Sequence, residues 1–238
     1  MTFGWTAVLV ASFAVTVLGQ AQDPNCQDLD PTCAIWAAND AAVCFTTQYI
    51  KANCRRSCNR CFKVPPEYDA NLLPSNLQPV QWLVGIWRSE HDGKARFPTI
   101  PVFTYGEEVD FHLAETPFAA IPTLNYSSFA WGINEAHDLH SEHGFLAVNP
   151  RRLDHVSLTT VMNNGFTSVE EGTVRGSRIH LELADIGRIS FARDMPVVSV
   201  TRVFTLLDRE TLEQRIEMET VATRNQEHTF IRYKKIYP

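Results

Sequence analysis

The histidines of this chain could serve two kinds of chemistry. A neutral imidazole can bind a metal ion, and an imidazole can gain or lose a proton near neutral pH. Eight histidines are present. His137, His140 and His143 recur every third residue in HDLHSEH, so on a helix they would share one face and could bind zinc. The stretch HGFLAVNP, which is typical of a strand, follows at once and would break that face. The pattern leaves a zinc site open but does not favour it.

The last apolar-alternating stretch, NQEHTFIRYKKI, spans residues 225–236, and the strand that it predicts begins at His228. Judged from its neighbours alone, it is a surface or capping histidine on a terminal strand. Strand alternation would put Phe230 on the face of His228, beside any ligand that an inward His228 binds. The same rule sends Arg232 and Lys234 to that face. An inward His228 therefore requires that these two side chains reach the mouth of a barrel or that the strand bulges.

The cysteines form one compact block. All six lie within residues 26–61: Cys26, Cys33, Cys44, Cys54, Cys58 and Cys61. Closely spaced thiols could bind zinc, but an even number in a short block is typical of a disulfide framework in an oxidising compartment. The apolar run from Trp5 to Leu18 indicates a signal peptide, which we place at residues 1–19. We therefore predict a secreted, disulfide-bonded chain without a transmembrane span.

Composition limits the classes of partner and the number of domains. The chain has 238 residues, a formal net charge of −6 and 45% hydrophobic residues. Nucleic acid binding needs a basic surface, so we expect no nucleic acid partner. The length suffices for one sizeable domain and a smaller one. We expect a linker at residues 62–78, where prolines and polar residues disfavour a helix or a central strand, and a large domain at residues 79–238.

Short apolar-alternating stretches in the large domain predict roughly ten antiparallel strands. TLEQRIEMET, residues 211–220, alternates most clearly, with Leu212 and Ile216 on one face and charged residues on the other. FTYGE, EEVDFHL, RIHLELA and GRISFAR are counted as separate strands. Gly176 in TVRGSRI predicts a tight hairpin. The predicted fold is mainly β, a closed antiparallel barrel large enough to hold a small ligand.

The spacing of the cysteines, which ends in C-x3-C-x2-C, resembles the ShK toxin-like domain. The resemblance implies a small helical domain at residues 26–61 with the disulfides Cys26–Cys61, Cys33–Cys54 and Cys44–Cys58, whereas the sequence alone leaves the connectivity open. Members that block potassium channels carry a Lys-Tyr pair, but here Tyr49 follows Gln48. A structural module, or one that binds an extracellular protein partner, fits better than a channel blocker.

The large domain resembles the nitrobindin and THAP4-like haem-binding family. Its motifs W-L-x-G-x-W, Y-P-T-I and F-x-Y-x-E occur in order within residues 82–111, with Phe97 in place of the tyrosine. LHSEHGFL, residues 139–146, is similar to the family's M-H-x-E-x-G-F, and EHTFIRYKK matches its C-terminal element at His228. The motifs keep the family's order over residues 77–238.

This resemblance implies a ten-stranded antiparallel barrel that holds haem b, with His228 as the proximal iron ligand and with Thr99 and His140 contacting the haem. It further implies that nitric oxide or another small nitrogen oxide binds there, and that ferric haem isomerises peroxynitrite to nitrate. An imidazole that ligates iron through one nitrogen needs an acceptor for the other, which the sequence does not identify.

Two other readings remain open. Lipocalins also carry a G-x-W motif at their first strand, and Gly85-x-Trp87 matches it. In lipocalins the tryptophan closes one barrel end beneath a basic residue, and the glycine permits close backbone approach. A carrier of an apolar ligand is therefore one alternative, and an interaction protein that acts through the ShK domain is the other. NYS at Asn125 is a sequon for N-glycosylation, which we expect to be used if it is exposed.

Overall fold

The computed structural model describes residues 26–58, 60–61, 64–97, 100–114, 121–133 and 138–238. The predicted signal peptide, residues 1–19, lies outside these ranges. The chain divides into two compact units, Met1–Lys63 and Val64–Pro238, and each is described by itself. Within the described ranges, no helix has the length and apolar character needed to cross a membrane.

The first unit is held together by disulfides around a very small core. Its helices are α1 (Cys33–Asn39), α2 (Val43–Thr46) and α3 (Gln48–Asn53). Disulfides join Cys26 to Cys61, Cys33 to Cys54, and Cys44 to Cys58, the same three pairs that the ShK resemblance implies. Ile50 is the apolar side chain buried among the sulfur atoms. A core of this size cannot by itself offset the entropy of folding, so cross-links supply the rest.

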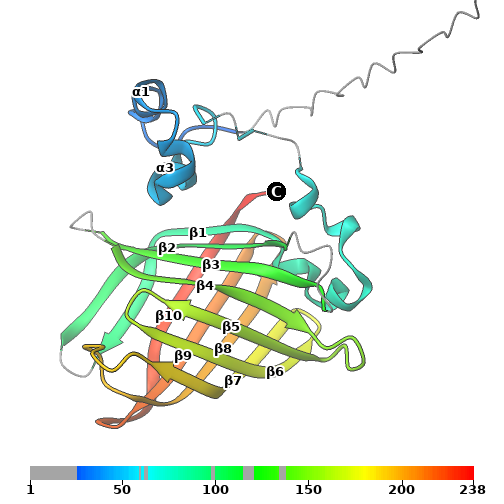
Figure 1. Cartoon of the computed structure of the whole chain (residues 1–238), viewed down its shortest axis with the longest axis vertical. Coiled ribbons are helices and arrows are strands. Elements are labelled where there is room, and N and C mark those ends of the chain that lie inside the picture. Colours follow the sequence, from blue (N-terminus) through cyan, green and yellow to red (C-terminus); the bar gives the residue numbers. More distant parts are fainter. Residues whose placement is uncertain (1–25, 59, 62–63, 98–99, 115–120, 134–137) are drawn as a thin grey trace, which may run out of the picture. The chain divides into compact units, whose positions relative to one another are not determined.

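The second unit is a closed barrel of ten antiparallel strands in which each strand pairs with its neighbours in sequence and β10 closes on β1 (Figure 1). The strands are β1 (Gly85–Phe97), β2 (Ile100–Leu113), β3 (Thr123–Gly132), β4 (Asp138–Val148), β5 (His155–Met162), β6 (Phe166–Arg175), β7 (Arg178–Arg188), β8 (Val197–Asp208), β9 (Thr211–Thr220) and β10 (Thr223–Tyr237). The predicted fold class is confirmed.

Most of the segment assigned to a linker belongs to the barrel unit instead. It forms three 3-10 helices, η1 (Pro66–Tyr68), η2 (Ala70–Leu72) and η3 (Ser75–Leu83). Leu77, Val80 and Leu83 of η3 are fully buried in the barrel core. Proline permits these short 3-10 turns although it disfavours a long α-helix, and the segment packs against the barrel.

Two of the expected strand divisions are wrong. FTYGE and EEVDFHL are one strand, β2, which pairs with β3 without interruption from Tyr105 to Leu113. GRISFAR is not a strand of its own, because β7 continues to Arg188 and then ends. The Arg188 guanidinium donates hydrogen bonds to the carbonyls of Ala192 and Asp194, at 2.6 and 2.9 Å, which turns the following residues away from the sheet.

One end of the barrel interior is apolar and fully buried. Trp87 is 0% exposed there, and its Nε1 donates to the Leu83 carbonyl of η3 at 2.7 Å. Lys235 Nζ lies 5.1 Å from the centroid of the Trp87 ring, and a Cβ on Gly85 would collide with the Tyr237 carbonyl. Both roles expected of the G-x-W motif are therefore confirmed. The other fully buried side chains at this end include Phe111, Leu124, Leu146, Leu158, Ile179, Leu181, Phe204 and Leu212.

Candidate functional site

Next to the apolar end of the barrel interior, the following inward-facing positions of the strands carry polar side chains, which are also buried. We call these side chains the polar layer. Its members are Glu107, Tyr126, Ser128, Glu142, Thr160, Ser168, Glu170, Arg202, Gln214 and Tyr233. Buried polar groups are costly unless they are hydrogen-bonded, and these form two hydrogen-bonded groups, one around Arg202 and one around Glu107. The layer separates the apolar end of the interior from the end that bears His228.

Arg202 is the cation of this layer. Its guanidinium pairs with both oxygens of Glu170, at 2.9 and 3.1 Å, and with both oxygens of Glu142, at 3.1 and 3.2 Å. Burial by itself would raise the pKa of Glu142, but the charges of Arg202 and His140 hold that pKa far below its usual range. Two carboxylates thus share one guanidinium in the barrel interior.

Glu107 is a third buried carboxyl group, and within the described ranges no cation is bonded to it. Ser128 and Tyr233 are its hydrogen-bond partners. The Tyr233 hydroxyl lies 2.9 Å from Glu107 and 2.6 Å from Gln214 Oε1, yet its single proton serves only one of them. Burial raises the pKa of Glu107. A protonated Glu107 that donates to Tyr233, which in turn donates to Gln214, satisfies all three groups.

Beyond the polar layer, the barrel interior opens to solvent. Strand alternation directs four apolar side chains inward here, yet they are only half-buried, unlike the inward side chains at the other end: Met162, Val200, Ile216 and Met218. On β9, the face with Leu212, Gln214, Ile216 and Met218 is the inner one, as predicted. An open chamber with apolar walls above a polar floor suits a mostly apolar ligand with few polar contacts.

His228 lies at a bulge in β10. Glu227 pairs with Glu217 of β9, but Thr229 pairs with the very next residue of β9, Ile216, so His228 is an extra residue in the ladder. The bulge changes the phase of the strand at this residue, and Ile231 and Tyr233 still point inward, both 0% exposed. Of the two solutions that the sequence left open, the structure has the bulge.

Phe230 consequently does not lie beside His228 as alternation predicted. Its ring packs under two guanidinium groups, with Arg215 at 4.4 Å and Arg232 at 5.4 Å from the ring centroid. These arginines also bind Glu213, each at 2.9 Å, and both side chains are exposed, so this cluster is on the outer surface. The expectation failed because strict alternation does not hold across a bulge.

The aromatic neighbour of His228 is Phe97 instead. The two rings are 4.7 Å apart and nearly perpendicular, and Phe97 stacks in turn on Phe103 at 5.8 Å. The carbonyl of Arg96 lies 3.1 Å from His228 Nδ1. This bond makes Nδ1 the protonated nitrogen and leaves the Nε2 lone pair free. Burial lowers the pKa of His228 more than the bond to Arg96 raises it, so the ring is neutral at neutral pH.

His140 belongs to the same chamber and has the opposite electrostatics. It points inward from β4, its side chain is 34% exposed, and its Nε2 lies 3.1 Å from Glu142 Oε1. Burial alone would lower the pKa of His140, but the hydrogen bond to Glu142 and the charge of that carboxylate raise it. His140 and His228 are close enough for the charge of His140 to lower the pKa of His228.

The remaining predicted site residues do not join this pair. Thr99 and His137 lie outside the described residues. His143 lies three positions after His140 on β4, so the two side chains point to opposite faces of the sheet. His143 is exposed on the outer face, and the two histidines therefore cannot share one zinc ion. Among the described residues, no three side chains of the metal-binding types are grouped closely enough to hold a metal ion.

Asn125, the glycosylation candidate, lies in β3. Its Nδ2 is 3.0 Å from His112 Nε2, and the other nitrogen of that ring is 3.1 Å from Asp110 Oδ1. Tyr68 of η1 donates to the same Asp110 carboxylate at 2.8 Å. The amide is half-buried within this chain of hydrogen bonds, so a glycan on Asn125 would have to replace its bond to His112.

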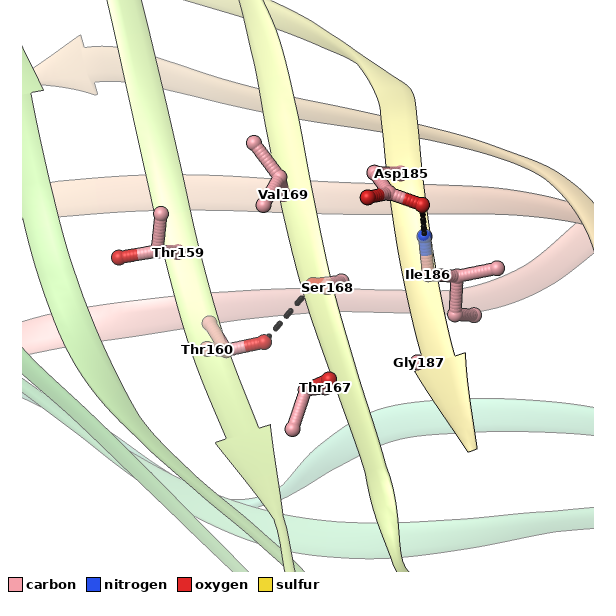
Figure 2. Close-up of a pocket in the computed structure, with 8 residues that line it drawn as sticks. All are labelled: Thr159, Thr160, Thr167, Ser168, Val169, Asp185, Ile186 and Gly187. Atoms are coloured by element: carbon pink, nitrogen blue, oxygen red, sulfur yellow. Dashed lines mark hydrogen bonds between the residues drawn. The ribbon is translucent and has the colours of Figure 1, made fainter. Parts of the chain in front are cut away.

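A pocket of about 330 Å³ is lined by residues of β5, β6 and β7 and by neither His140 nor His228 (Figure 2). It lies where the pairing of β6 with β7 shifts register after Val169. Figure 2 shows Thr160 and Ser168 pointing toward each other, with their hydroxyl oxygens 2.8 Å apart. The lining consists of hydroxyl groups, short apolar side chains and Asp185, and it contains none of the residue types that usually ligate haem iron, which are histidine, cysteine, methionine and tyrosine.

Sequence reasoning missed Arg202, Glu170 and Glu107. The signal was present, since each is a charged residue at an inward position of an otherwise apolar-alternating stretch, as in VTRVF around Arg202. A charge on the inner face of a strand is costly and therefore informative. The Arg96 carbonyl left no such signal, because any residue at that position offers a backbone acceptor.

Comparison with known proteins gives two matches that divide the chain as its two units do. The family model "THAP4-like, heme-binding beta-barrel domain" matches residues 76–235, and "ShK domain-like" matches residues 25–61. The uncharacterized protein C28H8.5 of Caenorhabditis elegans is 44% identical over 225 residues, which cover 90% of this chain and 74% of that protein.

Two further proteins resemble the barrel. Peroxynitrite isomerase THAP4 of Rattus norvegicus is 34% identical over 176 residues, or 74% of this chain, but this chain spans only 30% of that protein. The crystal structure of Rv2717c from M. tuberculosis has 30% identity and a TM-score of 0.58, and the match covers 68% of this chain and 98% of that one.

Proposed function

Because the chain belongs to the family of THAP4-like, haem-binding β-barrels and carries an ShK domain, we propose that its barrel binds haem b through His228 and thereby binds nitric oxide and isomerises peroxynitrite to nitrate. The name of the rat relative, peroxynitrite isomerase, supports the reaction. The activity is carried over only as a proposal, since this chain spans 30% of that relative.

The state of His228 is the observation that carries the proposal. A proximal ligand must be a neutral imidazole with one lone pair directed at the metal and the other nitrogen bound to an acceptor. His228 meets the first condition through its lowered pKa and the second through Arg96, whose carbonyl is 3.1 Å from Nδ1. Its ring is held in place by the edge-on contact with Phe97. The donor set therefore fits haem.

The walls of the open chamber supply the remaining requirements. Phe97 and Phe103 form a stacked aromatic pair next to His228, and the side chains of Met162, Val200 and Met218 are apolar. Such walls match the apolar faces of a porphyrin and offer a small ligand few hydrogen-bond donors. Haem bound in this chamber would supply an iron centre that can bind a nitrogen oxide.

Reconstitution of the full chain with haemin tests this function. The wild type should give a Soret band that shifts when nitric oxide is added, and His228→Ala should abolish or strongly shift that band. His143→Ala is the matched control, because His143 is exposed on the outer face of β4 and should leave the spectrum unchanged. Nitrate yield after mixing with peroxynitrite then measures the isomerisation. Absence of a Soret band, or one unaffected by His228→Ala, would refute the proposal and favour a carrier of another apolar ligand.

We further propose that the protein is secreted and that its ShK domain binds an extracellular protein partner. The support is the small first unit, whose three disulfides need an oxidising compartment. Expression of the full chain in animal cells should release protein without residues 1–19 into the medium. Loss of a mass increment on Asn125→Gln would show whether the sequon is used. Retention of the chain inside the cell with its leader intact would refute secretion.

A further inference from the structure

The buried charged residues form a chain that runs from the core to the open chamber. Side-chain exposure rises along it from 1% for Glu170 and 2% for Arg202 to 7% for Glu142 and 34% for His140. Each link is a direct contact between charged groups of at most 3.2 Å. His140 is therefore where this network meets the space that a ligand would enter.

The ring of His140 has one nitrogen anchored and one available. Nε2 donates to Glu142 Oε1, whereas Nδ1 has no hydrogen-bond partner in the part of the chain that the structure describes. A donor at Nδ1 requires the imidazolium form, and the charges in the layer favour that form. Arg202 alone faces the carboxylates of Glu142 and Glu170, so one negative charge remains to be balanced by His140.

The groups that face His140 come from four strands. Glu142 is on β4 beside it, Glu107 is on β2, Arg202 is on β8 and His228 is on β10. Glu142 favours the imidazolium, and Arg202 opposes it. The net effect is a raised pKa for His140, in agreement with the count of charges.

We propose that His140 donates its Nδ1 proton to an anionic oxygen inside the open chamber, and that Glu142, Arg202 and Glu170 are positioning residues that hold it there as a cationic donor. For the identity of the anion, this inference rests on the proposed function, since peroxynitrite and nitrate are nitrogen oxyanions. A carboxylate of bound haem offers the same chemistry. A protonated, hydrogen-bonded and partly buried imidazole binds either kind of anion, the nitrogen oxyanion or the haem carboxylate, much more strongly than a neutral imidazole would.

Nitrate binding by the haem-free full chain tests the inference without any catalysis. In protein labelled with nitrogen-15 at histidine, nitrate should shift the ring resonances of His140 in a saturable way at pH 6.5. His140→Gln and Glu142→Gln should each raise the Kd for nitrate about tenfold or more, which corresponds to a loss of about 1.4 kcal/mol of binding free energy. His143→Gln is the matched control on the outer face of the same strand and should bind nitrate as the wild type does.

A second arm identifies the source of the anion. Haemin and haemin dimethyl ester, whose carboxylates are blocked, are titrated into the wild type and His140→Gln. If His140 binds a haem carboxylate, the wild type should prefer haemin over the ester about tenfold, and His140→Gln should lose the preference. If it binds a small oxyanion, both haems should bind alike and only nitrate affinity should fall.

The inference is overturned if neither nitrate affinity nor the preference for haemin depends on His140. Its failure is distinguishable from failure of the proposed function, because the nitrate titration needs no haem. If His228→Ala leaves the haem spectrum unchanged while nitrate still binds at His140, the proposed function fails and the inference stands.

Discussion

Replacing Arg202 with methionine should damage the barrel more than any other single change in the polar layer. The Arg202 side chain is 2% exposed and pairs with two carboxylates, Glu142 and Glu170, whose side chains are 7% and 1% exposed. Arg202→Met leaves both carboxylates buried without a cation. Removal of one partner from a buried ion pair costs about 3–5 kcal/mol of the free energy of unfolding.

The magnitude converts directly into a melting temperature. For a domain the size of Val64–Pro238, a loss of 1 kcal/mol lowers the melting temperature by about 2–4 °C. We therefore expect Arg202→Met to melt about 6–20 °C below the wild type at pH 7. Tryptophan fluorescence of the haem-free chain measures this, since Trp87 is fully buried in the barrel. Urea unfolding at 25 °C gives the free energy itself.

A triple variant with Arg202→Met, Glu142→Gln and Glu170→Gln separates charge from packing. The triple variant removes the two carboxylate charges that Arg202→Met leaves buried without a cation. It should therefore recover more than half of the free energy of unfolding that the single variant loses. Acidification gives a further check. Without Arg202, burial would raise the folded-state pKa of Glu142 above its unfolded value, so the deficit of the single variant should shrink as the pH falls from 7 towards 5. A deficit below about 1 kcal/mol, or a triple variant no more stable than the single one, would refute this reasoning.

Four other expectations follow from the structure. The folded-state pKa of Glu142 is lowered, so its contribution to stability is complete above the unfolded value near 4.5 and is lost as the pH falls below that value; the melting temperature of Glu142→Gln should therefore depend less on pH between 5 and 3 than that of the wild type. Gly85→Ala should cost about 1–3 kcal/mol in urea unfolding, because Gly85 has a φ of 134° and a Cβ would meet the Tyr237 carbonyl. Gly176→Asn should cost less than about 1 kcal/mol, because its φ of 56° is one that asparagine adopts and nothing lies within 4 Å of its Cβ position; equal losses at the two glycines would contradict the role of the close contact. Dithiothreitol should make residues 26–61 sensitive to protease while the barrel, which has no cysteine, stays intact by mass spectrometry; simultaneous loss of the barrel would show that the units do not fold separately.

Alternation of apolar residues predicted the barrel well wherever a strand is regular. TLEQRIEMET coincides with β9, because its inner face is apolar or uncharged and its outer face carries the ion pairs of Glu213 and Arg215. GRISFAR was assigned wrongly because Ile189 and Phe191 look like strand residues. They are 44% and 84% exposed, respectively, beyond the end of β7. Composition cannot distinguish an apolar side chain that packs from one left in solvent.

The sequence singles out His228 as a candidate ligand but does not reveal the groups that support it. His228 could be singled out by the C-terminal motif, whereas the acceptor for its Nδ1 is the backbone of Arg96, 132 residues away in sequence. The bulge at His228 also leaves no mark in the sequence, since it arises from how β10 pairs with β9. The buried network is an intermediate case. Its charged residues are visible in the sequence, but only the closed barrel brings Glu142, Glu170 and Arg202 together.

The polar layer has a consequence for the order in which the molecule is assembled. The apolar contacts around Trp87 and Phe111 lie on one side of this layer, whereas His228 and the open chamber lie on the other. The packing around Trp87 therefore does not require a ligand in the open chamber. We expect the haem-free chain to complete its folding first and to take up haem reversibly through the open end afterwards.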